Sequence, residues 1–133
     1  MEIEKAQIKE KKQHGTGWVP YSYYACCISD YFSGVPLHWH DEFEINYILH
    51  GQGEFIFGEE RFKAKDGDIV IATPGLLHAI FNCEKTEVRY ETIVFKSDML
   101  GTESQDRSSS TYIHPIVNGT YGISPHITPD TPY

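Results

Sequence analysis

The sequence predicts an all-β fold, either a sandwich or a small barrel, and three observations support this. The chain has 133 residues, enough for one compact domain with a core of its own. Short runs of β-branched and aromatic residues recur along it, separated by glycine-, proline- or aspartate-containing turns roughly every 8–12 residues. The last residues contain Pro125, Pro129 and Pro132, which prevent regular structure there.

The N-terminal part of the chain is expected to hold an arm and then most of the strands. Residues 1–20 join a polar, charged stretch to a loop with glycine and proline, so we expect an arm that packs loosely. The strands after it are closed by turns such as Gly51-Gln52-Gly53 and Asp66-Gly67. The strands expected here are residues 21–28, 43–49, 54–57, 61–64, 68–72 and 76–81.

The C-terminal part is expected to add two more strands around a long loop. Residues 87–96 alternate between two sets of side chains, as a strand does. Residues 97–110 are polar and contain a serine run, so they predict a loop. Residues 112–117 are rich in strand-forming side chains and end at an Asn-Gly turn, which predicts the last strand. An irregular tail should follow.

Charge and hydropathy exclude several classes of protein. Eleven basic and 19 acidic residues give a formal net charge of -8, whereas nucleic-acid binders present a basic face. The chain alone is therefore not expected to bind DNA. No stretch approaches the about 18 consecutive apolar residues of a membrane helix, and the first residues do not resemble a signal peptide. We therefore expect a cytoplasmic protein that makes no membrane contact.

The candidate chemistry lies in one short segment. His38, His40 and Glu44 are separated by even numbers of residues, so on an extended strand their side chains share one face. Asn46 continues that face, and His78 follows in a later strand. Imidazoles with a carboxylate suit divalent first-row metals. The same face would equally serve as a metal-free polar pocket for an organic ligand, or be solvated.

The intervening residues of this segment are apolar. The odd positions hold Trp39, Phe43, Ile45, Tyr47 and Leu49, which should point to the opposite side of the strand. A strand of this kind either lines a pocket with its polar side or turns that side to water.

The spacing of these residues resembles the first of two motifs of the cupin superfamily. Three residues separate His40 from Glu44, and six more separate Glu44 from Gly51, as in the family motif. The glycine that opens the motif is displaced, because Phe32 stands at its position and Gly34 follows two residues later.

The second cupin motif is matched further along the chain. Gly67, Gly75, His78 and Asn82 fall in register, with Pro74 one residue after the position expected for proline. The resemblance implies a cupin-type double-stranded β-helix, a jelly-roll barrel, with few or no helices after it. It also implies that His38, His40, Glu44 and His78 stand at the positions that bind a divalent metal ion in cupins.

Residues 38–51 and 67–75 more narrowly resemble the N-terminal domain of AraC/XylS-type transcription regulators, and residues 112–119 resemble a segment that follows the barrel there. The resemblance implies a homodimer that senses a small effector, often a sugar. The effector would contact His38, His40, Glu44, Asn46 and His78. DNA would be bound only by a separate C-terminal helix-turn-helix domain.

The resemblance also implies a domain organisation. We expect an N-terminal arm over residues 1–20, the barrel over 21–119, and a tail over 120–133 that leads to a DNA-binding domain outside this chain. The arm, with Trp18 near the start of the barrel, is the part expected to move when the effector binds.

Two functions follow from these resemblances. The first is the sensory domain, which is not an enzyme. The alternative is a free-standing metal-dependent cupin enzyme, an oxygenase or isomerase, using zinc, nickel, iron or manganese at an open coordination position.

Overall fold

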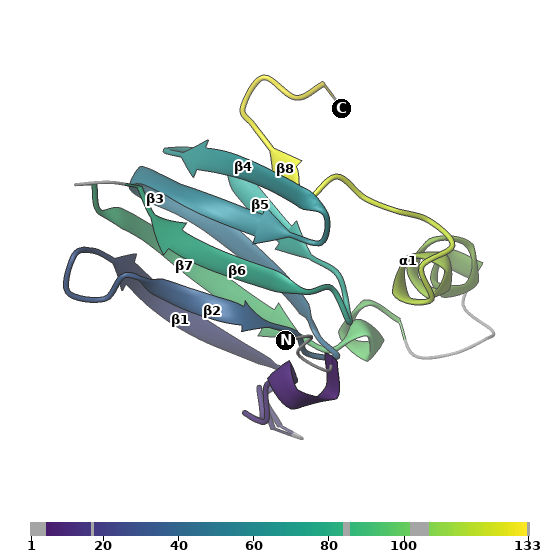
Figure 1. The fold of residues 1–133 in the computed structure, drawn as a ribbon. Helices are drawn as coiled ribbons and strands as arrows, with labels where there is room; N and C mark the ends of the chain where they lie inside the picture. Colours follow the sequence, from purple (N-terminus) through teal and green to yellow (C-terminus); the bar gives the residue numbers. More distant parts are fainter. Residues whose placement is uncertain (1–4, 17, 84–85, 102–106, 133) are drawn as a thin grey trace.

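The computed structural model describes residues 5–16, 18–83, 86–101 and 107–132, and these residues form two β-sheets that face each other (Figure 1). The all-β prediction is confirmed. The strands are β1 (Tyr21–Ile28), β2 (Gly34–His38), β3 (Phe43–Phe57), β4 (Glu60–Lys65), β5 (Ile69–Ala72), β6 (His78–Asn82), β7 (Val88–Phe95) and β8 (His126–Ile127).

Strand β3 belongs to both sheets. Its residues 43–51 pair with β7, and part of that segment pairs with β5, in a sheet of order β1-β7-β3-β5-β8. Its residues 52–57 pair with β4, and most of them also with β6, which in turn pairs with β2. All of these pairs are antiparallel. We call the first sheet the β1-side sheet and the second the β2-side sheet.

The expected break at Gly51-Gln52-Gly53 was wrong, because β3 continues through these residues. The register with β7 shifts between Ile48 and His50, and Gly51 has a φ of 86°. A Cβ atom on Gly51 would lie 1.8 Å from the carbonyl oxygen of Glu87, so only glycine fits. The bulge bends the strand from one sheet into the other instead of ending it.

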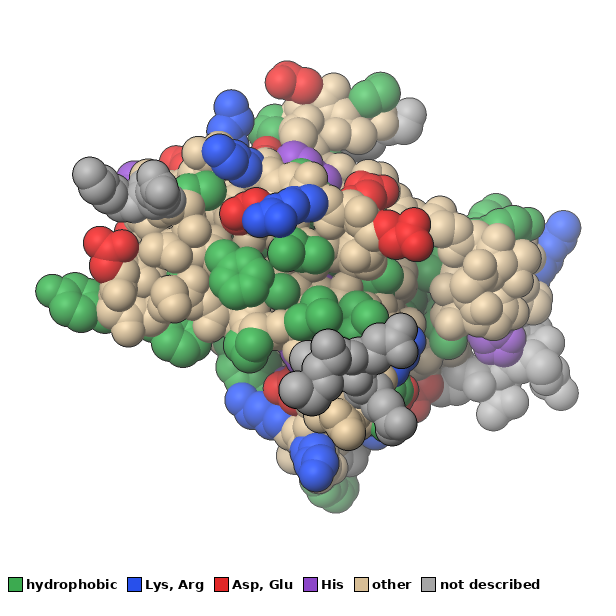
Figure 2. All heavy atoms as spheres, viewed as in Figure 1, with side chains coloured by type: hydrophobic (Ala, Val, Ile, Leu, Met, Phe, Trp, Pro, Cys, Tyr) green, Lys and Arg blue, Asp and Glu red, His purple; other side chains and the backbone are tan. Residues whose placement is uncertain are grey.

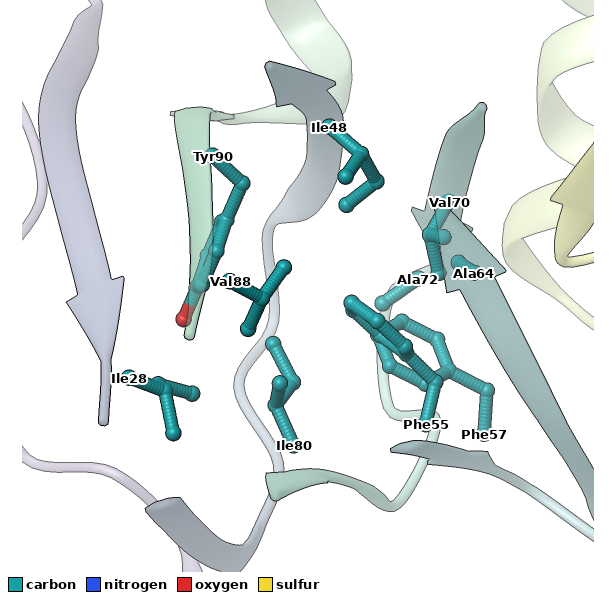
Figure 3. Close-up of a cluster of buried hydrophobic side chains, with 10 residues drawn as sticks. All are labelled: Ile28, Ile48, Phe55, Phe57, Ala64, Val70, Ala72, Ile80, Val88 and Tyr90. Atoms are coloured by element: carbon teal, nitrogen blue, oxygen red, sulfur yellow. The ribbon is translucent and has the colours of Figure 1, made fainter. Parts of the chain in front are cut away.

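The hydrophobic core lies between the sheets (Figure 3). Along β3, the inward side chains change from Ile48, which is fully buried in this core, to Asn46 and Glu44. Along β7 they change from Val88 to Thr92 in the same direction. The inward side chains of β3 and β7 therefore become polar toward one end of the barrel, which we call its polar end. The buried core residues are Ile28, Ile48, Phe55, Phe57, Ala64, Val70, Ala72, Ile80, Val88 and Tyr90.

The strand expected over residues 112–117 was wrong, because these residues are helical. A π-helical turn, η3 (Ser109–Ile113), continues into α1 (His114–Val117). The apolar residues Tyr112, Ile113, Ile116 and Val117 have helical spacing, which the β-branched composition obscured. Pro115 lies in the first turn of α1, where proline is tolerated.

The loop expected over residues 97–110 is helical in part. It begins with a 3-10 turn, η2 (Ser97–Leu100), and residues 107–110 are already helical. Residues 102–106 lie outside the described part of the chain.

The expected irregular tail contains a short strand that is fastened to the barrel. In β8, Ile127 pairs with Ile69 of β5. The Nε2 atom of His126 lies 2.8 Å from Oδ2 of the buried Asp68, and the His126 ring stacks on Phe62. The prolines on either side of β8 limit it to two residues.

The N-terminal arm is docked on the barrel through Trp39. A 3-10 turn, η1 (Lys5–Ile8), precedes residues that run beside Trp39. The indole Nε1 of Trp39 donates to the carbonyl of Lys5 at 2.7 Å, and the backbone N–H of Glu10 donates to the carbonyl of Trp39 at 2.8 Å. Trp18 is 97% exposed. None of the described helices has the length and apolar character needed to cross a membrane.

Candidate metal and ligand site

The four predicted metal positions converge at the polar end of the barrel. The potential ligand atoms of His38, His40, Glu44 and His78 all lie within 4.8 Å of one another. A first-row divalent ion with bonds of about 2.1 Å holds its ligand atoms up to about 4.2 Å apart. Small rotations of these side chains are therefore enough to form a coordination shell.

The expectation that His38, His40 and Glu44 share the face of one strand was wrong. His38 ends β2, His40 directly precedes the bend at residues 41–42, and Glu44 is the second residue of β3. The fourth residue, His78, begins β6. The site thus joins the two sheets, and the bend between β2 and β3 provides the convergence that a flat strand lacks.

Each of the three imidazoles is oriented by a backbone carbonyl. The Nδ1 atoms of His38, His40 and His78 lie 2.9, 3.1 and 2.8 Å from the carbonyl oxygens of Pro36, Glu42 and Leu76. Because a carbonyl only accepts, Nδ1 carries the hydrogen in each ring. The Nε2 atom of each neutral ring is then a lone-pair donor to a metal.

This donor set suits a divalent cation. Glu44 Oε2 lies 3.0 Å from Nε2 of His40 and 3.3 Å from Nε2 of His78. With neutral rings, lone pairs of nitrogen and oxygen face one another, and a cation between them satisfies all of them. Without a cation, the rings must take up protons to donate to the carboxylate.

Burial and hydrogen bonding act in opposite directions on the charges. Burial would raise the pKa of Glu44, but hydrogen bonds from His40, His78 and Asn46 outweigh it and hold that pKa well below its usual range. Burial lowers the pKa of His40, yet the neighbouring Glu44 carboxylate raises it overall. Burial, with the charge of His78, lowers the pKa of His38. Glu44 is thus ionised.

Asn46 lies behind Glu44 and orients it. Its side chain is fully buried, and Nδ2 donates to Oε1 of Glu44 at 2.9 Å. Its Oδ1 accepts a hydrogen bond from the Thr92 hydroxyl at 2.6 Å. Asn46 therefore leaves Oε2, the other carboxylate oxygen, to face the histidines.

A cavity of about 230 Å³ lies beside the cluster. His38 and Glu44 reach its wall, and Tyr24, Tyr90 and Thr92 add hydroxyl groups to it. Burial raises the pKa of Tyr90 far above its ordinary value, so this hydroxyl stays neutral and can donate or accept. The remaining lining residues are Glu10, Lys12, His14, Cys26, Val35, Ile80 and Val94.

The arm closes one side of this cavity, which the sequence did not predict. His14 had no assigned role, yet it is 4% exposed and its ring lies 5.7 Å from that of His40. Its ring nitrogens lie 2.7 Å from the Tyr24 hydroxyl and 3.1 Å from a Glu10 carboxylate oxygen. No motif spacing marks His14. The inward alternation of residues 87–96, in contrast, carries a signal for Tyr90 and Thr92.

Near the His/Glu cluster, the polar side of β3 points inward and the alternate apolar residues Tyr47 and Leu49 point outward, although Phe43, expected on the outward side, is only 5% exposed. Glu44 and Asn46 are buried, whereas Tyr47 and Leu49 are 45% and 47% exposed. Of the two arrangements that the sequence left open, the one with a pocket on the polar side is therefore the one found.

Sequence comparisons relate most of the chain to one family. The family model described as the AraC-like ligand binding domain matches residues 22–124. An uncharacterized HTH-type transcriptional regulator of Bacillus subtilis, YdeC, is 33% identical over 84 residues, covering 62% of this chain and 29% of that protein. An oxalate-binding protein of Thermotoga maritima is 36% identical over 63 residues, covering 47% of this chain and 52% of that protein. The matches span about half or less of these relatives.

Structural comparisons agree with the expected barrel type. A cupin protein from Bacteroides fragilis has a TM-score of 0.55 at 21% identity, over 66% of this chain and 73% of that one. A predicted oxalate decarboxylase from Thermotoga maritima has a TM-score of 0.52 at 29% identity, over 56% of this chain and 64% of that one. The prediction of a cupin double-stranded β-helix is confirmed.

Proposed function

Because the chain belongs to the AraC-like ligand binding domain family, we propose that it senses a small effector in the cavity beside the His/Glu cluster. The observation that carries this proposal is the position of the cavity, between the cluster on the barrel and Glu10, Lys12 and His14 of the arm. A ligand there contacts two parts of the chain that are far apart in sequence, so its binding energy can bias how they pack.

The effector is proposed to be a small polar organic molecule. The cavity volume of about 230 Å³ lies below the about 300–1,000 Å³ of pockets for drug-sized ligands. Hydroxyl groups and imidazoles suit a sugar, the class implied by the regulator resemblance. The oxalate-binding relative supports a short carboxylate, which Lys12 at the cavity would pair with.

A divalent metal fits the four converging side chains. We propose that His38, His40, Glu44 and His78 hold it and that Asn46 keeps Glu44 in place. The ion would supply a positive centre for an oxygen atom of the effector. The chain's own hydroxyl groups, on Tyr24, Tyr90 and Thr92, would then bind the rest of that molecule.

The arm is proposed to transmit occupancy, with Trp39 as the residue that links it to the site. His38 and His40 flank Trp39, whose ring lies 5.0 and 4.7 Å from the Nζ atoms of Lys5 and Lys9. A ligand that moves either histidine therefore changes the seat of the arm. A coupling of about 1–3 kcal/mol is typical of such devices.

The test is a thermal-shift screen of neutral pentoses, hexoses and short mono- and dicarboxylates, each with and without added divalent metal. A true effector at 100 times its Kd adds about 2.7 kcal/mol of stability, which raises Tm by several degrees in a domain of this size. Tyr90→Phe should reduce the shift, whereas Tyr112→Phe, which alters an exposed tyrosine of η3, should not. A panel without any shift, or one unaffected by Tyr90→Phe, would refute the proposed site.

The alternative function is a metal-dependent cupin enzyme, and the His/Glu donor set is the observation that favours it. Incubation of the metal-loaded protein with each hit of the screen separates the two functions. A sensor returns the ligand unchanged, whereas an enzyme converts it at a rate that His78→Ala abolishes.

The proposed regulator also needs a partner copy and a DNA-binding part. The Bacillus subtilis relative is named as an HTH-type regulator, which supports DNA contact through a separate domain and a cytoplasmic location. We propose that this chain forms a homodimer and that it is organised as an arm over residues 1–20, a barrel over 21–119 and a tail over 120–133, whose short strand β8 joins the barrel sheet.

A further inference from the structure

The outer surface of the β1-side sheet is apolar, although an antiparallel sheet with one buried face normally has a polar outer face. One row across the strands holds Tyr23, Ile93, Ile45 and Ile71, which are paired in register. Next to it, Tyr47 pairs with Ile69. The inner side of the same strands already faces the hydrophobic core and the cavity. These outward residues therefore form a second apolar surface, separate from the core.

The outer surface of the β2-side sheet provides the contrast within the same molecule. There Glu54 pairs in register with Lys63, and Arg61 forms an ion pair with Glu54. Figure 2 shows this side of the molecule, where Lys, Arg, Asp and Glu lie mainly in the upper part of the face and hydrophobic side chains gather below them. The β2-side sheet thus carries charged pairs beside exposed apolar side chains such as Phe81, whereas the row on the β1-side sheet is apolar throughout.

The exposure of the apolar face is large. Tyr21, Tyr23, Tyr47, Ile93 and Met99 are between 41% and 52% exposed, which is roughly 100 Å² for each residue of this size. With the partly buried isoleucines around them, the face offers roughly 700 Å², above the about 300–600 Å² typical of the largest patch on a monomer. It also approaches the about 800 Å² that one partner contributes to a standard interface.

We propose that this face, composed of Tyr21, Tyr23, Ile45, Tyr47, Ile93 and Met99, is the surface through which two copies of the chain form a dimer. The proposal rests on the homodimer suggested under the proposed function and assigns it a surface. A two-fold contact sets the same surface against itself. A face that self-associates must therefore carry few charges of one sign, because they would repel the same charges of the other copy.

The charge distribution fits a second copy better than a charged partner. The chain has a net charge of -8, so most of its surface repels another copy. Among the described residues of β1, β7 and β5, the outward charges are Glu91 and Arg89, and Glu91 accepts a hydrogen bond from Tyr23 at 2.8 Å. A hollow of about 590 Å³ lined by Tyr21, Tyr23, Ile93 and Met99 can receive side chains of the facing copy.

The test is sedimentation velocity of the chain and three variants at about 5 to 200 µM, a range that brackets a micromolar Kd. Ile93→Lys and Tyr47→Lys each place a charge on the face, which would have to be buried against the apolar side chains of the facing copy. Each should weaken dimerisation at least tenfold. The matched control is Phe81→Lys, which changes an exposed apolar residue of β6 on the β2-side sheet and should leave the dimer intact. Far-UV circular dichroism verifies that every variant is folded.

Three outcomes would overturn the proposal. A wild-type chain that is monomeric throughout the range lacks the dimer, and a dimer unaffected by both lysine variants uses another surface. If a longer chain carrying this domain dimerises with a Kd that Ile93→Lys does not change, the dimer of that chain uses another surface. Effector binding, measured separately by thermal shift on Ile93→Lys, distinguishes these failures from failure of the sensory function.

Discussion

Replacement of His78 by alanine should remove most of the metal affinity while the barrel stays folded. His78 contributes one of the four converging ligand atoms. Loss of a residue that merely supports a ligand weakens metal binding by about 10–100-fold. Loss of a direct ligand should therefore raise Kd by at least about 100-fold, equivalent to about 2.7 kcal/mol.

The metal-free stability of this variant should change by less than would unfold the protein. The His78 side chain is fully buried, and its ring centroid lies 5.1 Å from that of Phe57. Its truncation leaves a void and deprives Glu44 of one partner, which together should cost about 1–3 kcal/mol. Affinity and stability must therefore be measured separately.

The assay is titration calorimetry with Ni²⁺ and Zn²⁺ after dialysis against a chelator, together with elemental analysis. His50→Ala is the matched control, since its imidazole is 74% exposed and lies outside the cluster. Wild-type protein and control should bind one equivalent of metal. One equivalent in His78→Ala at the wild-type Kd would show that His78 is not a ligand, and no binding by the wild-type chain would refute the metal site itself.

Three further predictions concern the site and the strand that carries it. Asn46→Ala removes the hydrogen bonds that Asn46 makes with the Thr92 hydroxyl and with Oε1 of Glu44, so urea unfolding should show a loss of about 2–4 kcal/mol. Thr92→Val should lose about 1 kcal/mol, and equal losses would contradict the role of Asn46. Gly51→Ala forces a Cβ against the Glu87 carbonyl at positive φ, so Tm should fall by more than about 5 °C, and an unchanged Tm would show that the bend adapts. Metal affinity should weaken at least about tenfold from pH 7.5 to 5.5, because protons compete for the ligating imidazoles. The metal Kd is measured by calorimetry at both pH values, and an equal Kd at the two would contradict imidazole ligation.

The sequence predicted the positions that a motif fixes and missed those that depend on packing. The motif spacing identified His38, His40, Glu44 and His78, and the structure brings their side chains together. The expectation that three of them share one face of a strand was wrong. Spacing by two residues describes a straight strand, whereas this chain bends directly after His40. Residue spacing alone does not encode where a strand ends.

The arm illustrates the same limit. Its charged composition predicted a loosely packed segment, and neither periodicity nor a motif marks His14. The docking of the arm depends on contacts with Trp39, which lies more than twenty positions along the chain. Composition indicates whether a segment can form a core of its own, but not whether a small number of hydrogen bonds will hold it on one formed by other residues.

Strand β3 combines the two surfaces on which the proposed regulation depends. Glu44 and Asn46 point into the cavity end of the barrel, whereas the alternate residues Ile45 and Tyr47 lie on the outer apolar face. A shift of β3 at Glu44 therefore moves Ile45 by a similar amount, since consecutive side chains share one backbone. Effector binding and dimerisation can be coupled here without a long pathway. The coupling exists only if the effector binds the two arrangements of β3 with different affinity. Because a dimer holds two effector sites, saturating effector should then change the dimer Kd by the square of the factor by which effector affinity differs between dimer and monomer.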